Sequence, residues 1–201
     1  MEIYVAPPRG KKEKEACLFW LNHFGHEVIW LDLRRKVKGP LLLCGGADIG
    51  KDPERDEKEF IWIKQALDGG HKILGLCRGM QILNTYFGGT VVDLEDTIVE
   101  EHKAANFAEN VDHSGKPSRF HTVEDLDGNL INVNSRHHQH CNVIADNFKT
   151  THISFPMNSI VEGFEDLEKQ IWAVQWHPEK MGYDNVLSGC FAEAFLNAVK
   201  K

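Results

Sequence analysis

The segment Gly75-Leu76-Cys77-Arg78-Gly79 has the residue types of a nucleophile at a strand-to-helix turn. It lies between a short apolar run and a helical pattern, with a glycine two residues before and two residues after the cysteine. Such a turn strains the backbone of the nucleophile, and the glycines remove side chains that would clash there. The thiol would also lie at a helix N-terminus, where the macrodipole favours the thiolate. The segment therefore predicts a nucleophile at Cys77.

A base and a carboxylate occur much later in the chain, in the segment Trp176-His177-Pro178-Glu179. The preceding apolar run predicts a strand, so His177 should lie at the carboxyl edge of the sheet, where Cys77 is also expected. A thiolate needs a base that generates it and that protonates the leaving group. Glu179 could fix the tautomer of the imidazole. Together these residues predict a Cys-His-Glu hydrolase.

Acyl transfer also needs hydrogen-bond donors for the developing oxyanion. The main-chain N–H of Arg78, directly after the nucleophile, is one candidate. The second must come from a neighbouring strand end, and Gly45-Gly46 follows a buried apolar run. Without side chains, its amides can approach a ligand closely. An ordinary glycine turn is the alternative interpretation of this pair.

The segment Asn134-Ser135-Arg136-His137-His138-Gln139-His140 is dense in hydrogen-bonding groups. Its three histidines raise the question of a zinc site. Apart from the adjacent Cys141, however, no carboxylate or cysteine has a suitable spacing to them. We therefore predict a loop that grips the substrate, with no metal and no other cofactor.

The composition predicts one soluble globular domain spanning residues 1–201, because the chain is 42% hydrophobic and 26% charged. The net charge of −7 argues against a nucleic-acid partner, and no apolar run approaches membrane-spanning length. The five cysteines show no CxxC spacing, which favours neither a disulfide framework nor a zinc knuckle. No signal peptide is recognisable, so we expect a cytoplasmic protein.

The elements that must position these residues follow an α/β pattern. Continuous apolar strands favour a mostly parallel sheet with helices on both faces. After residue 91 the strands become shorter, and we expect them to be partly antiparallel. The predicted strands are 3–6, 28–33, 41–44, 73–76, 121–123, 130–133, 151–155, 160–164 and 171–175, and the predicted helices are 11–24, 57–67, 80–87 and 184–200.

Taken together, these motifs resemble the class I glutamine amidotransferase superfamily over roughly residues 40–180. Within it, they resemble the γ-glutamyl-amide hydrolase branch typified by γ-glutamyl-γ-aminobutyrate hydrolase. The segments that carry the resemblance are 41–48, Arg55-Asp56-x-x-Glu59, 75–81, Asn84 with Gly88-Gly89-Thr90, 134–139 and 174–179.

The resemblance implies a flavodoxin-like fold and a thioester mechanism. Cys77 would attack the γ-carbonyl of a γ-glutamyl amide, and His177, oriented by Glu179, would protonate the leaving nitrogen and then activate water. The main-chain amides of Gly46 and Arg78 would hold the oxyanion. The residues that match the family's grip on the glutamyl α-carboxylate and α-amine are Gln81 and the segment His137, His138, Gln139 and His140.

Two departures from the family pattern concern the rigidity of the loop at Gly45-Gly46 and the identity of the leaving group. Cys44 stands where a proline is usual before the two glycines, and the region before residue 40 is shorter than in the polyamine-pathway hydrolases. That region is basic, with eight Lys or Arg against five Asp or Glu. Such a positive charge would suit an anionic leaving group. Related enzymes act on substrates of this kind, the γ-glutamyl nucleotide amidates, including γ-glutamyl-CDP-amidate in capsule phosphoramidate synthesis. A γ-glutamyl amine is the other candidate substrate, and an ordinary solvated surface is the other interpretation of the charge.

Two other functions remain as alternatives. A glutaminase subunit would supply ammonia to a partner synthetase, whereas the hydrolase would need only its small-molecule substrate. A non-catalytic binding module is disfavoured because Cys77, His177 and Glu179 are all present. Nucleic acid and membrane partners are not expected, and a homodimer is compatible with the sequence.

Overall fold

The computed structural model describes residues 1–32, 34–95, 119–156 and 160–181. Within them the α-helices are α1 (Lys11–His23), α2 (Pro53–Asp68) and α3 (Arg78–Tyr86), followed late in the chain by the 3-10 turn η1 (Pro178–Lys180). Helix α2 begins earlier than predicted, because Asp52 accepts a hydrogen bond from the Arg55 amide and Pro53 suits the first turn. The helix predicted at 184–200 lies outside the described residues.

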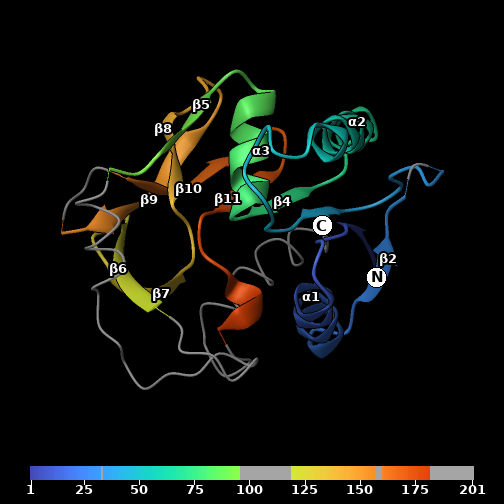
Figure 1. The fold of residues 1–201 in the computed structure, drawn as a ribbon, viewed down its shortest axis with the longest axis horizontal. Helices are drawn as coiled ribbons and strands as arrows, with labels where there is room; N and C mark the ends of the chain where they lie inside the picture. The colour runs from blue at the N-terminus through green and yellow to red at the C-terminus, as the bar shows by residue number, and fades with distance from the viewer. Residues whose placement is uncertain (33, 96–118, 157–159, 182–201) are drawn as a thin grey trace.

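Among the described residues, nine strands form one continuous mixed sheet (Figure 1). Its first five strands are parallel, and the parallel order turns antiparallel after β11, which pairs with β4 on one side and β10 on the other. The antiparallel part is therefore larger than the predicted small extension. In spatial order the strands are β2 (Glu27–Trp30), β1 (Glu2–Ala6), β3 (Leu41–Leu43), β4 (Ile73–Leu76), β11 (Ile171–Val174), β10 (Val161–Asp166), β9 (Lys149–Phe155), β6 (Arg119–Asp125) and β7 (Leu130–Ser135).

A second, two-stranded sheet joins β5 (Thr90–Asp93) to β8 (Gln139–Val143). Neither strand is predicted from the sequence, because each is short and partly polar and pairs with a strand that is distant in the sequence. The side-chain amide of Asn84 holds this sheet, donating to the main-chain oxygens of Thr90 at 3.1 Å and Val143 at 2.8 Å. Segment 134–140, predicted as a loop, is therefore the end of β7, a three-residue connection and the start of β8.

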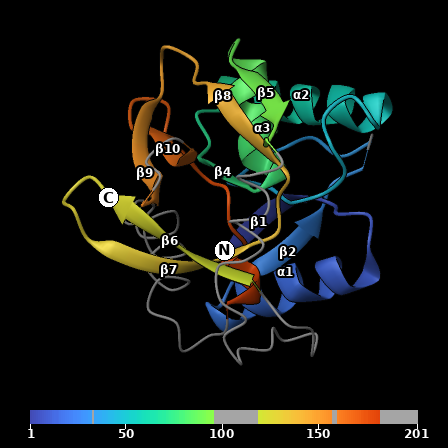
Figure 2. The ribbon, with the colours of Figure 1, turned by 60° about the vertical axis from the view of Figure 1, so that its left-hand side comes forward.

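The helices cover both faces of the parallel part of the sheet, as the apolar runs predict. Helix α1 lies on one face, and α2 and α3 lie on the other (Figure 2). Successive residues of a strand serve opposite sides: Leu42 packs in the cluster under α1, while Leu41 and Leu43 pack in the cluster under α2 and α3. This double coverage makes β3 and β4 fully buried, so their carboxyl ends are held rigidly.

The turn from β4 into α3 has the backbone that the nucleophile segment predicts. Cys77 has a φ of 53°, and its amide donates to the Val174 carbonyl oxygen at 2.8 Å. Helix α3 then passes close to strand backbone: a Cβ at Gly79 would lie 2.1 Å from the Leu43 carbonyl oxygen, and one at Gly75 would lie 2.6 Å from the Gly79 oxygen. Only glycine allows this approach, which brings the start of α3 directly onto β3 and β4.

A buried ion network connects α2 to this turn. Glu59 accepts from the Arg55 Nε at 2.8 Å, and the guanidinium of Arg78 donates to both Glu59 and Asp56. The other end of Arg55 reaches the main-chain oxygens of Cys44 at 3.4 Å and Gly45 at 3.3 Å. One helix face thus fixes both the residue after Cys77 and the loop after β3.

Replacing Glu59 with glutamine should lower the free energy of unfolding by about 3–5 kcal/mol, because two buried guanidinium groups lose their shared carboxylate. Urea denaturation followed by circular dichroism measures this change. Glu57→Gln, an exposed position on the same helix, is the matched control and should change stability by about 0.5 kcal/mol or less. Equal stability of the two variants would contradict the structural role given to Glu59.

Candidate active site

Cys77 lies on a pocket of about 420 Å³ at the carboxyl ends of the parallel strands. The pocket brings together residues that are far apart in the sequence, and the structure thus places three of the predicted groups side by side. His177 and Glu179 line it with Cys77, and so do Gly45 and Gly46 from the loop after β3. The neighbouring strands β4 and β11 explain this, since Leu76 is in register with Val174 and the chain leaves both strands at the same edge.

His177 and Glu179 form a buried pair. The His177 Nδ1 lies 2.7 Å from the Glu179 Oε1, and both residues are about 5% exposed. Because a carboxylate can only accept, the Nδ1 carries the proton in this contact, which leaves the Nε2 for other chemistry. The 3-10 turn η1, which begins at Pro178, allows two residues so close in sequence to face each other.

The charges around His177 change its pKa. Burial lowers the pKa of the imidazole, but the neighbouring charges and hydrogen bonds of Glu179 and Cys77 outweigh burial and raise it to about 9. For Glu179, burial would raise the pKa of the carboxyl, and the His177 charge and hydrogen bond hold it below its ordinary value. The pocket thus favours an imidazolium paired with a carboxylate at neutral pH.

Two amide side chains support the site through contacts that the sequence analysis does not predict. Gln175 is fully buried, and its Nε2 lies 3.5 Å from the Cys77 Sγ. Asn134 grips the main chain of His177 at both ends, accepting from its N–H and donating to its carbonyl oxygen, each at 2.8 Å. Both residues stand inside segments that carry the family resemblance, and that position was the available signal.

Gly45 and Gly46 are held against side chains of the site. A Cβ at Gly45 would lie 2.6 Å from the His177 Cε1, and a Cβ at Gly46 would lie 2.0 Å from the Arg55 Nη1. The side chain of Arg78 is buried toward α2, so this residue can offer the site only its main chain. These positions are compatible with the predicted oxyanion donors, whose role remains a prediction.

The predicted substrate-binding residues lie in different environments. Gln81 is buried, with its Nε2 3.1 Å from the Gln139 carbonyl oxygen and 3.2 Å from the Gln175 Oε1. His138 is largely exposed and pairs with Asp48, whereas the His137 side chain is 2% exposed and faces Glu162 in the interior. Gln139 and His140 begin β8, with the Gln139 side chain donating to Asp93. Their predicted contacts with a glutamyl group stay predictions.

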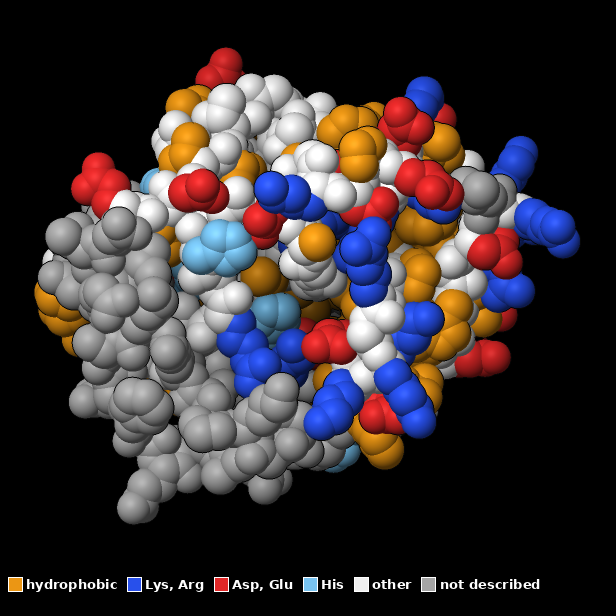
Figure 3. Space-filling model, viewed as in Figure 1, with side chains coloured by type: hydrophobic (Ala, Val, Ile, Leu, Met, Phe, Trp, Pro, Cys, Tyr) orange, Lys and Arg blue, Asp and Glu red, His pale blue; other side chains and the backbone are white. Residues whose placement is uncertain are grey.

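Cations also line the pocket of Cys77. They are Arg9, which pairs with Asp52 at 2.6 Å, together with Arg136 and Lys180. Lys and Arg side chains gather near the middle of one face of the molecule, beside histidine side chains (Figure 3). Two of these three cations come from late in the chain, so the basic first forty residues are not the main source of positive charge here.

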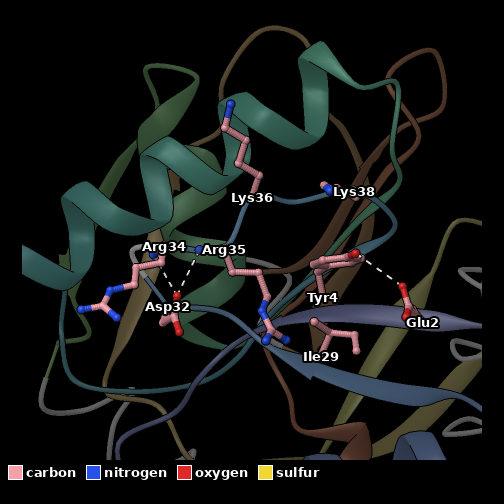
Figure 4. Close-up of a pocket in the computed structure, with 8 residues that line it drawn as sticks. All are labelled: Glu2, Tyr4, Ile29, Asp32, Arg34, Arg35, Lys36 and Lys38. Atoms are coloured by element: carbon pink, nitrogen blue, oxygen red, sulfur yellow. Dashed lines mark hydrogen bonds between the residues drawn. The ribbon is translucent and has the colours of Figure 1, made fainter.

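Most of the basic residues that follow β2 line a different pocket. Arg34, Arg35, Lys36 and Lys38 line a hollow of about 620 Å³ beside Tyr4 (Figure 4). The main-chain amides of Arg34 and Arg35 both donate to Asp32, which holds this part of the chain (Figure 4). The hollow shares no lining residue with the pocket of Cys77, so the predicted basic rim is divided between two places.

Within the part of the chain that the structure describes, no helix is long and apolar enough to cross a membrane. Among the same residues, His121, His137 and Glu162 are grouped closely enough to hold a metal ion. This group lies outside the pocket lining and includes one of the histidines considered in the sequence analysis.

Comparison with known proteins finds several relatives of this chain. The glutamine amidotransferase-like protein YvdE of Lactococcus lactis is 34% identical, over 83% of this chain and 80% of that protein. GMP synthase of Wolinella succinogenes is 29% identical over 77% of this chain, which corresponds to only 27% of that enzyme.

Two solved structures share the fold. A glutamine amidotransferase from Thermotoga maritima superimposes with a TM-score of 0.64 at 16% identity, covering 100% of this chain and 84% of that one. PurLQS from the same organism gives a TM-score of 0.67 at 16% identity, covering 99% and 97%. The flavodoxin-like α/β fold implied by the sequence is therefore confirmed.

Residues 45–179 match the model of one protein family, and this span includes the nucleophile turn and the His-Pro-Glu segment. The match covers well over half of the sequence, and the relative YvdE supports it over most of both chains. This chain belongs to the peptidase C26 family.

Proposed function

We propose that this protein hydrolyses a γ-glutamyl amide through a glutamyl thioester on Cys77. The observation that carries the proposal is the single pocket that holds the Cys77 thiol together with the buried His177–Glu179 pair. Membership of the peptidase C26 family and the glutamine amidotransferase-like relatives support a cysteine enzyme of this general type. The γ-glutamyl substrate and the residue roles are the proposal itself.

The proposed reaction has two steps. The Cys77 sulfur forms a bond to the γ-carbonyl carbon, and the C–N bond breaks as His177 gives its proton to the leaving nitrogen. Water then attacks the thioester, His177 takes a proton from it, and glutamate leaves as the C–S bond breaks. Glu179 keeps the imidazole in one orientation throughout, which its 2.7 Å contact with the Nδ1 allows. Main-chain amides at Gly46 and Arg78 would stabilise the oxyanion in both steps.

The leading substrate is a γ-glutamyl nucleotide amidate such as γ-glutamyl-CDP-amidate. Arg9, Arg136 and Lys180 line the pocket of Cys77, and phosphate groups on the leaving side would find charge-assisted donors there. A γ-glutamyl amine would not use these cations. The proposal therefore places specificity on the leaving-group side of the scissile bond, with the glutamyl end common to all substrates.

A glutaminase subunit is the second candidate. The similarity to GMP synthase favours it, since the chain matches a part of that larger enzyme. The purified chain alone distinguishes the two functions: rapid glutamate release from γ-glutamyl nucleotide amidates without a partner supports the hydrolase. Release from glutamine that appears only with a partner synthetase would instead support the subunit.

Cys77→Ala and Cys77→Ser should abolish glutamate release, and wild-type protein quenched during turnover should carry the mass of a glutamyl group on Cys77. The matched control is Cys141→Ala, because burial raises the pKa of that thiol to about 12 and keeps it protonated. Intact-mass spectrometry and a glutamate assay measure both effects. Normal turnover in either Cys77 variant would exclude the thioester mechanism.

Arg136→Gln and Lys180→Gln should each raise KM for a γ-glutamyl nucleotide amidate about tenfold, because each removes a charged hydrogen-bond donor. KM for an uncharged γ-glutamyl amine should stay the same. Steady-state kinetics on both substrates measures the difference, with Lys38→Gln in the separate basic hollow as control. Equal changes for both substrates would count against an anionic leaving group.

The raised pKa of His177 predicts a pH dependence of stability. A group whose pKa is higher in the folded state stabilises the fold fully below its unfolded pKa of about 6.5, and this contribution disappears as the pH rises through about 9. The free energy of unfolding should therefore fall between pH 7 and 10 more in the wild type than in His177→Gln. Urea denaturation across this range measures it, and NMR titration of the ring in wild type and Glu179→Gln shows directly whether the carboxylate raises the midpoint.

A further inference from the structure

A second group of ionisable side chains lies buried in the antiparallel half of the sheet. His121 comes from β6, Glu162 from β10, and His137 from the connection between β7 and β8. Their side chains are between 0% and 6% exposed, and one ligand atom from each lies within 4.8 Å of the others. The residues are far apart in sequence, so only the fold brings this set together.

The proton on His137 can be placed from its main-chain contact. Its Nδ1 lies 3.1 Å from the carbonyl oxygen of Gln139, and a carbonyl oxygen can only accept. The Nδ1 therefore carries a proton, and in the neutral ring the Nε2 presents a lone pair. That Nε2 faces the Glu162 Oε1 at 3.5 Å, so two electron-rich atoms point at each other unless positive charge lies between them.

The distances suit a metal ion in that position. His121 Nε2 to Glu162 Oε2 and His137 Nε2 to Glu162 Oε1 are both 3.5 Å, longer than the usual 2.7–3.2 Å or so of a hydrogen bond. Zinc binds imidazole nitrogen and carboxylate oxygen at about 2.0–2.2 Å, and a tetrahedral angle then separates neighbouring ligand atoms by about 3.3–3.5 Å. Metal-binding histidines also characteristically donate their other ring N–H to a backbone carbonyl, as His137 does.

We propose that His121, His137 and Glu162 bind a divalent transition-metal ion, with zinc as the reference ion and water completing its coordination. Imidazole and carboxylate ligands suit zinc and its neighbours in the first transition row. The sequence analysis predicted no metal because no carboxylate stood near the histidines in sequence, and Glu162 enters only through β10.

The site would be a structural metal site beside the proposed substrate pocket. The Gln139 carbonyl oxygen that orients His137 also accepts a hydrogen bond from the side chain of Gln81. The main-chain oxygen of Glu162 accepts from the main-chain N–H of Gln175, and the side chain of Gln175 contacts Cys77. A metal would thus fix β6, β10 and the connection at residues 136–138 relative to one another. It would have no part in bond breaking, and metal binding can be tested separately from activity.

The experiment measures zinc bound by untagged Cys77→Ala protein, since the Cys77 thiolate and His177 could themselves bind zinc. After loading with zinc and dialysis against metal-free buffer, one zinc per chain should remain by elemental analysis. A second substitution in the Cys77→Ala protein, either Glu162→Gln or His121→Asn, should weaken zinc binding by at least about tenfold in titration calorimetry. Adding His71→Asn, which removes a histidine outside the group, should leave binding unchanged. Cobalt(II) should give a tetrahedral visible spectrum without thiolate charge-transfer bands.

Folding of each variant is checked by circular dichroism, and Glu162→Gln keeps the shape of the side chain if His121→Asn fails to fold. Zinc should raise the melting temperature of the Cys77→Ala parent and leave that of Glu162→Gln unchanged. Absence of zinc binding in the parent would overturn the proposal. Equal binding by the parent and Glu162→Gln would overturn it as well, and the group would then be an imidazolium–carboxylate ion pair. Neither result bears on glutamate release, so the proposed hydrolysis stands or falls separately.

Discussion

The arrangement of the pocket depends on the ion pairs that the buried carboxylate of Glu59 makes. This carboxylate holds the guanidinium groups of Arg55 and Arg78. Arg55 reaches the loop after β3, and Arg78 is the first residue of α3. Taking three charges out of water is costly unless each finds partners in good geometry. Here Arg55 also donates to the main chain of the loop after β3, and Arg78 also donates to Asp56. The charge network therefore ties the position of α2 to the position of both segments.

The second constraint is the pairing of β4 with β11. Since the two strands are parallel and in register, the chain leaves both of them at one edge, and Cys77 and His177 meet without any contribution from flexible loops. Hydrogen bonds then hold the backbone on either side: the Cys77 amide donates to Val174, and Asn134 grips His177 at both its N–H and its carbonyl. A site built on strand ends in this way keeps its geometry before any substrate arrives.

The parts of the fold that could be predicted from the sequence are those whose signal is local. Strand β4 and helix α1 stand out because continuous apolar runs and helical spacing need no knowledge of a partner. Strands β5 and β8 were missed because each is stabilised by the other and by Asn84, far away in the sequence. Gln175 and Glu162 were missed for the same reason, since neither spacing nor residue type reveals a contact that closes only in three dimensions.

The order of the chain has a consequence for how such a protein can change. Everything from β5 to β10 is inserted between α3 and β11, two elements already packed on the same strand, β4. The ends of an insertion that begins and finishes at neighbouring points are held together by the core, and lengthening it costs little additional closure entropy. Evolution could therefore remodel the antiparallel half, with its own buried histidines and carboxylate, while the reacting thiol and imidazole stay where the parallel strands put them.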